Sequence, residues 1–432
     1  MTELRSWKPI LQNGLASRAW EALWQIADAL AETDHTEAGP DDLSSSALLF
    51  SYLWKAGFGE QWAERSVQHL NWAGERATLL NGVGLHGGIA GFGWKFNHIA
   101  SLLGIQENGM NAQAADMDDE ALKAIDDLLI STLREKVWLR HYDLISGLVG
   151  LGIYFLDRLP SPPAHEAITL IIHHLESLAH LDEDGICWHT PADLVSNFVR
   201  DERPNGHFDL GVAHGIPGVI FLLGECCLSA IEPDKAMSLL RGAIAWMDSR
   251  EDDGSDMYKY SCQYIPGGRK FGSRIGWCYG DLGYAAVLRY LSTYPNFSFL
   301  KGTSSRLLSH CSTWLPSDES IRDAPLCHGA IGVAHIWIRS YQAEPDGIWR
   351  DVAIRWYERA LSLTRPGGNL GGFFAWHPDR EQPFVADPSL LSGAVGVALA
   401  LMAGLVPVEP LWDRALCLSR TGRAGATNIL TK

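Results

Sequence analysis

Apolar residues along this chain gather in short runs, and most runs begin just after two glycines that stand three residues apart. Val219–Leu223 and Val397–Leu401 are two such runs. The paired glycines recur six times, at Gly88/Gly91, Gly147/Gly150, Gly215/Gly218, Gly280/Gly283, Gly329/Gly332 and Gly393/Gly396. Their first members lie 59, 68, 65, 49 and 64 residues apart. A recurrence of this kind indicates an internal structural repeat.

Each repeat has room for two helices. The segments between the glycine pairs place apolar residues at helical spacing, as in Leu170–Leu178. A unit of about 60 residues accommodates two average helices and their loops. Because glycine has no side chain, helix starts that carry it can approach one another closely. Six hairpins favour a closed ring over an open solenoid, whose apolar ends would need caps. The pattern therefore predicts an all-α fold, an α/α toroid that occupies residues 1–432 as a single domain.

Three connections between the predicted helices are long and rich in turn residues. They span residues 181–209, 251–273 and 366–388, and short strand-like pieces lie within them at Met257–Tyr260 and Gly372–Trp376. Loops of this length are often functional. We expect strand-containing insertions here, and residues 181–209 are the first candidate for a small strand-rich insertion.

The longest apolar stretch, Leu390–Val406, is long enough to resemble a membrane span. Glycines interrupt it, and it repeats the pattern of the five earlier glycine pairs, so we interpret it as a buried helix. The first residues contain no apolar core followed by a small-residue cleavage site, so no secretory signal is expected. The sequence thus predicts a cytoplasmic protein without a membrane span.

Composition and charge restrict the partners. Hydrophobic residues make up 47% of the chain and charged residues 20%, which is typical of a folded protein rather than a disordered one. The formal charge of −16 argues against nucleic acid or an anionic membrane surface as the main partner. It is compatible with a basic peptide substrate, although the same acidity also serves solubility. In a reducing compartment, the eight cysteines are more often metal ligands or catalytic groups than disulfides.

Two cysteines and a histidine stand directly before glycine pairs. Cys278 lies in the segment Trp-Cys-Tyr-Gly, and Cys327 and His328 lie in the segment Cys-His-Gly one repeat later. Consecutive repeats are neighbours in a toroid, so these side chains can meet at one mouth of the ring. Two thiolates and an imidazole suit zinc and leave a fourth position open. The competing explanation is that both cysteines are buried apolar fillers. The other six are expected to be structural: Cys187, Cys226, Cys227, Cys262, Cys311 and Cys417.

Further polar residues occupy similar places in the repeats. His214 and Tyr279 each directly precede a first glycine, Asp143 precedes its glycine by four residues, and Arg274 precedes Cys278 by four. On one rim beside a metal, they would supply an acid, a base and an anion stabiliser. Taken singly, the aspartate is equally well a helix cap and the histidine a structural residue. His86 is close to the first glycine pair and is a candidate lining residue.

These segments resemble the lanthionine synthetase C family. The family's marks are a Trp-Cys-Tyr-Gly segment, a Cys-His-Gly segment and repeated Gly-x-x-Gly helix starts, and all three occur here between Gly88 and Gly396. The resemblance implies a zinc ion held by Cys278, Cys327 and His328, with a water or a substrate thiolate completing the shell. It also implies that the four further polar residues match the family's catalytic positions: His214, Asp143, Arg274 and Tyr279.

The resemblance further implies an enzyme of lanthipeptide biosynthesis. Such a cyclase joins cysteine thiols of a precursor peptide to dehydroalanine or dehydrobutyrine, forming thioether rings. The length resembles the separate cyclase of class I pathways, with a dehydratase and an exporter as partners and a place at the membrane periphery through their complex.

Other functions remain open from the residues themselves. A relative that adds glutathione to dehydroamino acids would use the same zinc site. A zinc-stabilised binding scaffold would have a closed shell of four protein ligands, but only three candidates occupy motif positions. A toroid glycosidase needs paired carboxylates at the ring mouth, where only Asp143 and Asp281 are available. The glycine-rich segment 367–372 lacks a following helix with Lys and Ser or Thr, which argues against a phosphate loop.

Overall fold

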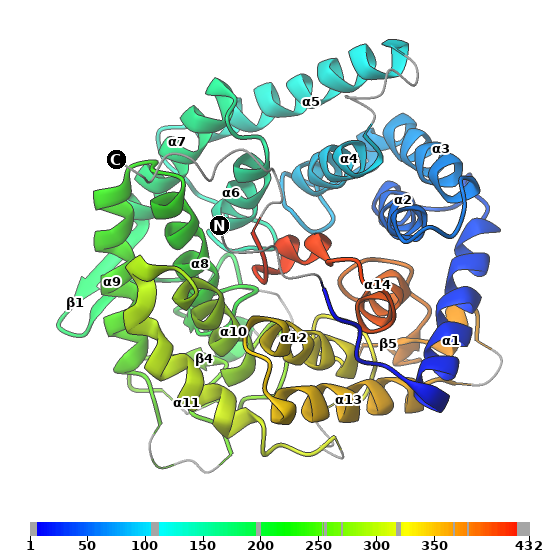
Figure 1. The fold of residues 1–432 in the computed structure, drawn as a ribbon. Helices are drawn as coiled ribbons and strands as arrows, with labels where there is room; N and C mark the ends of the chain where they lie inside the picture. The colour runs from blue at the N-terminus through cyan, green and yellow to red at the C-terminus, as the bar shows by residue number, and fades with distance from the viewer. Residues whose placement is uncertain are drawn as a thin grey trace.

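The protein is an α/α toroid, as the glycine repeat predicts (Figure 1). A computed structural model describes residues 7–104, 112–195, 200–252, 254, 257–268, 271–316, 321–365, 368–377 and 380–420. Helices form two concentric rings, one around the other, and strands are few and short. Within these residues, no helix combines the length and the apolar character that crossing a membrane requires.

The inner ring closes on itself. Within the described ranges it contains seven helices: α2 (Pro40–Lys55), α4 (Ile89–Leu103), α6 (Leu148–Asp157), α8 (Ile216–Leu228), α10 (Asp281–Ser292), α12 (Ala330–Ala343) and α14 (Ala394–Leu405). Each packs against the next, and α14 packs against α2. The outer ring contains α1 (Asn13–Ala31), α3 (Gln61–Glu75), α5 (Ala112–Leu133), α7 (Pro162–Leu178), α9 (Pro233–Asp248), α11 (Lys301–Cys311) and α13 (Gly347–Ser362). Because α1 packs against α14, the two ends of the chain together close the ring.

The glycine pairs mark six of these seven inner helices. In each marked helix the first glycine is the residue just before the helix, namely Gly88, Gly147, Gly215, Gly280, Gly329 or Gly393. The seventh, α2, has no such pair and begins at Pro40 after Gly39. The sequence therefore predicts six hairpins, whereas the described part of the chain contains seven inner helices, because the repeat signal is missing from α2.

The glycines are required by the loops that precede the helices more than by contacts between helices. A Cβ on Gly280, whose φ is +95°, would lie 1.8 Å from the carbonyl oxygen of Arg274. A Cβ on Gly332 would lie 1.9 Å from the carbonyl oxygen of Leu326. In both cases the oxygen belongs to the residue six positions earlier. Each loop folds back over the start of its own helix, and a side chain at either glycine would prevent this.

These loops are joined around the ring mouth by backbone hydrogen bonds. The amide of Ala213 donates to the carbonyl of Cys278 (3.3 Å), that of Cys278 to Cys327 (3.1 Å), and that of Cys327 to Leu391 (3.0 Å). All four residues stand two positions before a first glycine. The equivalent His86 donates to the carbonyl of Ile145 (3.1 Å). Residues at one repeat position are therefore held side by side along the rim.

The strands form three small antiparallel pairs in the long connections. They are β1 (Ala179–Asp182) with β2 (Gly185–Trp188), β3 (Phe208–Asp209) with β4 (Gln263–Tyr264), and β5 (Ala375–Trp376) with β6 (Phe384–Val385). The expected strand at Met257–Tyr260 is wrong, because the amides of Lys259 and Tyr260 donate to the carboxylate of Asp281 instead. Short 3-10 helices complete the chain: η1 (Ala77–Leu79), η2 (Arg200–Glu202), η3 (Pro295–Leu300), η4 (Leu370–Gly372) and η5 (Leu411–Leu416).

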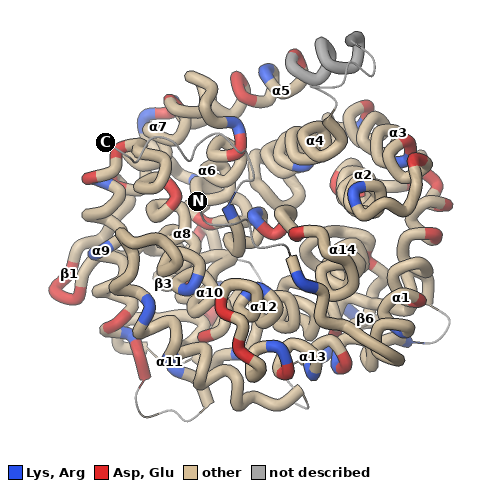
Figure 2. Tube along the Cα trace, viewed as in Figure 1, with Lys and Arg blue, Asp and Glu red and all other residues tan. Residues whose placement is uncertain are grey.

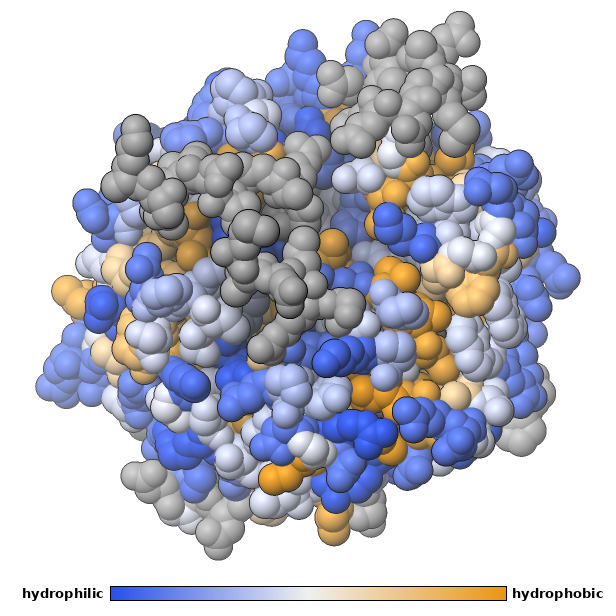
Figure 3. Space-filling view, in the orientation of Figure 1, coloured by the Kyte–Doolittle hydropathy of each residue, from blue (hydrophilic) through white to orange (hydrophobic). Residues whose placement is uncertain are grey.

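The segment that follows α14 returns to the middle of the ring, where Figure 1 shows it in red. Its η5 carries Arg414, which pairs with Oδ1 of Asp157 in α6 at 2.6 Å and with Oε2 of Glu225 in α8 at 3.0 Å. The neighbouring Asp413 binds Nε2 of His335 in α12 at 2.7 Å. Buried ion pairs thus tie this segment to three inner helices. Other charges lie largely on the outer helices and loops (Figure 2), and the face drawn in Figure 3 is mostly hydrophilic with scattered apolar areas where it is coloured.

Candidate metal centre and active site

The structure brings Cys278, Cys327 and His328 together at the ring mouth. Their ligand atoms all lie within 4.8 Å of one another, and among the residues described this is the one group of at least three His, Cys, Asp or Glu side chains so arranged. Cys278 is buried, and the other two are half-buried. The loops that carry them are neighbours because Cys278 donates its amide hydrogen bond to the carbonyl of Cys327. The repeat register therefore predicted this juxtaposition correctly.

The electrostatics of the two thiols suit a bound cation. A hydrogen bond from the Cys327 thiol lowers the pKa of Cys278 well below its usual range, against burial and with help from His328 and Arg274. The same hydrogen bond, followed by burial, raises the pKa of Cys327. One proton is thus shared between the two sulfurs, since two buried thiolates in contact repel each other. A divalent cation between them would replace that proton, so the donor set fits a thiophilic metal.

His328 has a carboxylate beside it that the sequence analysis missed. Its Nε2 lies 3.7 Å from Oδ2 of Asp323, so the carboxylate is close enough to pair with the ring when His328 is protonated. Asp323 is buried and accepts a hydrogen bond from the amide of Trp376 at 2.9 Å. A carboxylate next to a ligating histidine commonly fixes its ring and tautomer. Burial raises the pKa of Asp323, and the charge of His328 partly offsets this.

His214 and Asp143 form a pair along the same rim. Nδ1 of His214 lies 2.6 Å from Oδ2 of Asp143. The Asp143 side chain is 3% exposed, whereas that of His214 is 42% exposed, so the imidazole is the accessible member. Burial alone would lower the pKa of His214, but the hydrogen bond and charge of Asp143 raise it to about 9. Asp143 also accepts from the amide of Ser146 at 2.8 Å, so it shapes its turn as well.

Tyr279 lies between the other predicted catalytic residues. Its ring stacks near that of His214, with centroids 6.2 Å apart, and the guanidinium carbon of Arg274 lies 5.8 Å from the Tyr279 ring centre. Burial alone would lower the pKa of Arg274, but the nearby sulfurs of Cys278 and Cys262 outweigh burial and raise that pKa. Cys262 was assigned to the structural cysteines, yet it lies beside Arg274. All seven predicted site residues therefore lie at one end of the ring.

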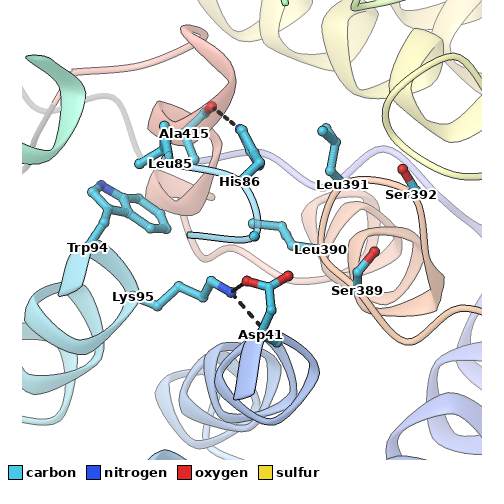
Figure 4. Close-up of a pocket in the computed structure, with 11 residues that line it drawn as sticks. Asp41, Leu85, His86, Trp94, Lys95, Ser389, Leu390, Leu391, Ser392 and Ala415 are labelled. Atoms are coloured by element: carbon cyan, nitrogen blue, oxygen red, sulfur yellow. Dashed lines mark hydrogen bonds and ion pairs between the residues drawn. The ribbon is translucent and has the colours of Figure 1, made fainter. Parts of the chain in front are cut away.

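A pocket of about 170 Å³ lies among α2, α4 and the loop before α14 (Figure 4). Its wall includes Leu391, whose carbonyl accepts the amide hydrogen bond of Cys327. Figure 4 shows Lys95 reaching the carboxylate of Asp41, and His86 turned toward the carbonyl of Ala415. His86 thus lines a pocket whose walls do not include Cys278, Cys327 or His328.

The comparisons with known proteins agree with this arrangement. The sequence profile described as "Lanthionine synthetase C-like protein" matches residues 43–417. The chain therefore belongs to the lanthionine synthetase C-like family. Among solved structures, the fold is similar to one titled "Nisin cyclase", with a TM-score of 0.71 and 16% identity, over 94% of this chain and 98% of that chain. No curated protein matches the sequence.

Proposed function

We propose that this member of the lanthionine synthetase C-like family is a zinc-dependent lanthipeptide cyclase. It would add a cysteine thiol of a dehydrated precursor peptide to the β-carbon of dehydroalanine or dehydrobutyrine in the same peptide. The S–H bond breaks, a C–S bond forms at the β-carbon, and the α-carbon receives a proton. The reaction needs no oxidant or reductant, because one thiol and one double bond become one thioether.

The observation that carries this proposal is the convergence of three metal-binding side chains beside an accessible imidazole. Cys278, Cys327 and His328 are the residues that would hold zinc. They leave a coordination position for an outside ligand, as catalytic zinc sites with three protein ligands do. When bound, zinc supplies a Lewis acid that lowers the pKa of a coordinated thiol from about 8.5, so that the thiol ionises at neutral pH.

The protein's own groups would manage the proton and the developing charge. His214, held by Asp143 and protonated below a pKa of about 9, is suited to deliver a proton to the α-carbon. After that step its neutral form is suited to take the proton of the next thiol. Arg274 is charged and half-buried, which suits it to stabilise the enolate that forms when the thiol attacks. Tyr279 would keep His214 and Arg274 apart and in place.

The substrate would be a peptide that reaches the open mouth of the ring. The formal charge of −16 favours a basic peptide over an acidic one. A dehydratase that supplies the dehydroamino acids and an exporter that removes the product are the proposed partners. The proposed location is the cytoplasm, at the membrane periphery when the partners are assembled.

The test is cyclisation of a dehydrated lanthipeptide precursor by the purified, zinc-loaded protein. Cyclisation leaves the peptide mass unchanged, so free thiols are counted by alkylation and mass spectrometry. We expect thiols to disappear with the wild-type protein and to persist with Cys327→Ala. Persistence of all thiols with the wild-type protein would refute the proposal. If added glutathione becomes attached while the peptide's own thiols persist, glutathione addition is the activity.

A further inference from the structure

A second buried carboxylate faces the candidate active site from the strand-containing connections. Asp209 ends β3 and is 3% exposed. Its Oδ1 accepts hydrogen bonds from the hydroxyl of Tyr279 (2.9 Å) and from Nε2 of the Gln263 side chain (3.1 Å). Its Oδ2 lies 2.8 Å from Nε2 of His207. Although burial alone would raise the pKa of Asp209, the hydrogen bond and charge of His207 outweigh it, so the carboxylate is ionised at neutral pH.

The backbone around Asp209 is fixed against the metal-binding loop. Asp209 pairs with Gln263 in the β3–β4 ladder, and the amide of Leu210 donates to the carbonyl of Cys262 at 3.0 Å. Two residues after Asp209, a Cβ on Gly211 would lie 2.2 Å from the carbonyl oxygen of Cys278 and 2.5 Å from the Tyr279 ring. This glycine therefore permits the close approach that brings the carboxylate to the phenol.

The phenol that Asp209 holds is in contact with two groups of the proposed reaction. The Tyr279 ring lies near the His214 imidazole and beneath the Arg274 guanidinium. If the ring turned, both neighbours would lose the side chain against which they pack. Asp209 is therefore connected to the reacting groups through Tyr279, whereas Asp143 contacts His214 directly.

We propose that Asp209 is a positioning residue of the active site, which fixes the Tyr279 ring and thereby the placement of His214 and Arg274. This inference rests on the proposed cyclase function. It also assigns a role to the strand-containing connections. Strand β3 supplies the carboxylate that binds the Tyr279 hydroxyl, and β4 pairs with β3. Two buried carboxylates, Asp143 and Asp209, then hold the two aromatic side chains of the site.

The experiment is a double-mutant cycle of Asp209→Asn and Tyr279→Phe, with Asp126→Asn as the matched control. Asp126 is also buried and accepts a tyrosine hydroxyl, that of Tyr154, at 2.6 Å, but it lies on the outer helix α5. The loss of one hydrogen bond to a charged group corresponds to about 10- to 100-fold in rate. We expect Asp209→Asn to lower kcat by about this factor with an unchanged KM and zinc content, and Asp126→Asn to leave kcat unchanged.

The outcome in the Tyr279→Phe background decides between positioning and a general structural role. If Asp209 acts through the phenol, adding Asp209→Asn to Tyr279→Phe lowers kcat by less than about threefold. Equal losses in both backgrounds, or wild-type kcat in Asp209→Asn, would overturn the inference.

A second readout does not depend on cyclase activity. The protein is labelled with ¹³Cζ-tyrosine for NMR, and the Tyr279 resonance is assigned by its absence in Tyr279→Phe. This resonance should shift in Asp209→Asn and not in Asp126→Asn. If the wild-type protein cyclises no peptide while this resonance shifts, the proposed function fails and the positioning stands. If the resonance is unmoved in Asp209→Asn, the positioning fails whatever the activity.

Discussion

Replacing Arg414 by Met removes a buried cation that two buried carboxylates share in the middle of the ring. Arg414 is 2% exposed, and its partners Asp157 and Glu225 lie in neighbouring inner helices. Other donors remain in the variant, among them the Trp94 indole at 2.7 Å for Asp157 and the Tyr290 hydroxyl at 2.6 Å for Glu225. Removing one member of a buried ion pair costs about 3–5 kcal/mol, because the remaining charge is left uncompensated.

We therefore expect Arg414→Met to lower the free energy of unfolding by about 3–5 kcal/mol. For a chain this long, a loss of that size lowers Tm by only about 3–5 °C, so urea unfolding is the better assay. The comparison of Arg414→Met with wild type is made at one pH, by urea unfolding of both proteins.

Matched variants separate charge from packing at this position. Adding Glu225→Gln to Arg414→Met removes one of the two stranded charges and should restore part of the stability. A single Arg414→Met variant within about 1 kcal/mol of wild type would refute the reasoning, since it would mean that the ion pairs barely compensate their own desolvation. A stability deficit that Glu225→Gln does not relieve at all would point to lost packing instead.

Three further predictions concern the site and its loops. Elemental analysis is expected to find about one zinc ion per chain in the wild-type protein and none in Cys327→Ala. His214→Ala should keep the zinc and lose cyclisation. Full activity in His214→Ala would remove that residue from the mechanism. Gly280→Ala should cost about 3 kcal/mol or more in urea unfolding, because its Cβ would strike the Arg274 carbonyl and φ is +95°, whereas Gly302→Ala, with open space around it, should be neutral or slightly stabilising. The pKa of His214 is raised from 6.5 to about 9, so its pairing with Asp143 contributes stability that is complete below about pH 6.5 and lost as the pH rises through about 9. Because the imidazole is 42% exposed, we expect the free energies of unfolding of wild type and His214→Gln to differ by only about 1 kcal/mol near pH 6. A difference that stays constant up to pH 10 would contradict this prediction.

The glycine repeat made the toroid predictable because it is a steric requirement of the fold. At each pair, a Cβ would clash with a carbonyl oxygen of the preceding loop, and only glycine avoids this clash. Replacing these glycines would therefore disrupt the loop. The inner helix α2 escaped prediction because it begins at Pro40 without such a loop. The short strands were misplaced in part, since two-residue pairings are set by tertiary contacts: Lys259 and Tyr260 bind the Asp281 carboxylate rather than a partner strand.

The carboxylates that support the site were missed although the repeat register contains them. Asp209 and Asp323 each stand six residues before a first glycine, as Arg274 does. At this position the loop turns back over its helix, and the carbonyl of Asp323 accepts the first helical amide, that of Ala330, at 3.1 Å. The backbone there is fixed at the rim, which holds the side chains of Asp209, Arg274 and Asp323 at the ring mouth. Counting only the residues next to the glycines found the candidate metal ligands. Counting back to the loop start would also have found Asp323 beside His328 and Asp209 on the Tyr279 hydroxyl, because both sets are fixed by the same fold of the loop.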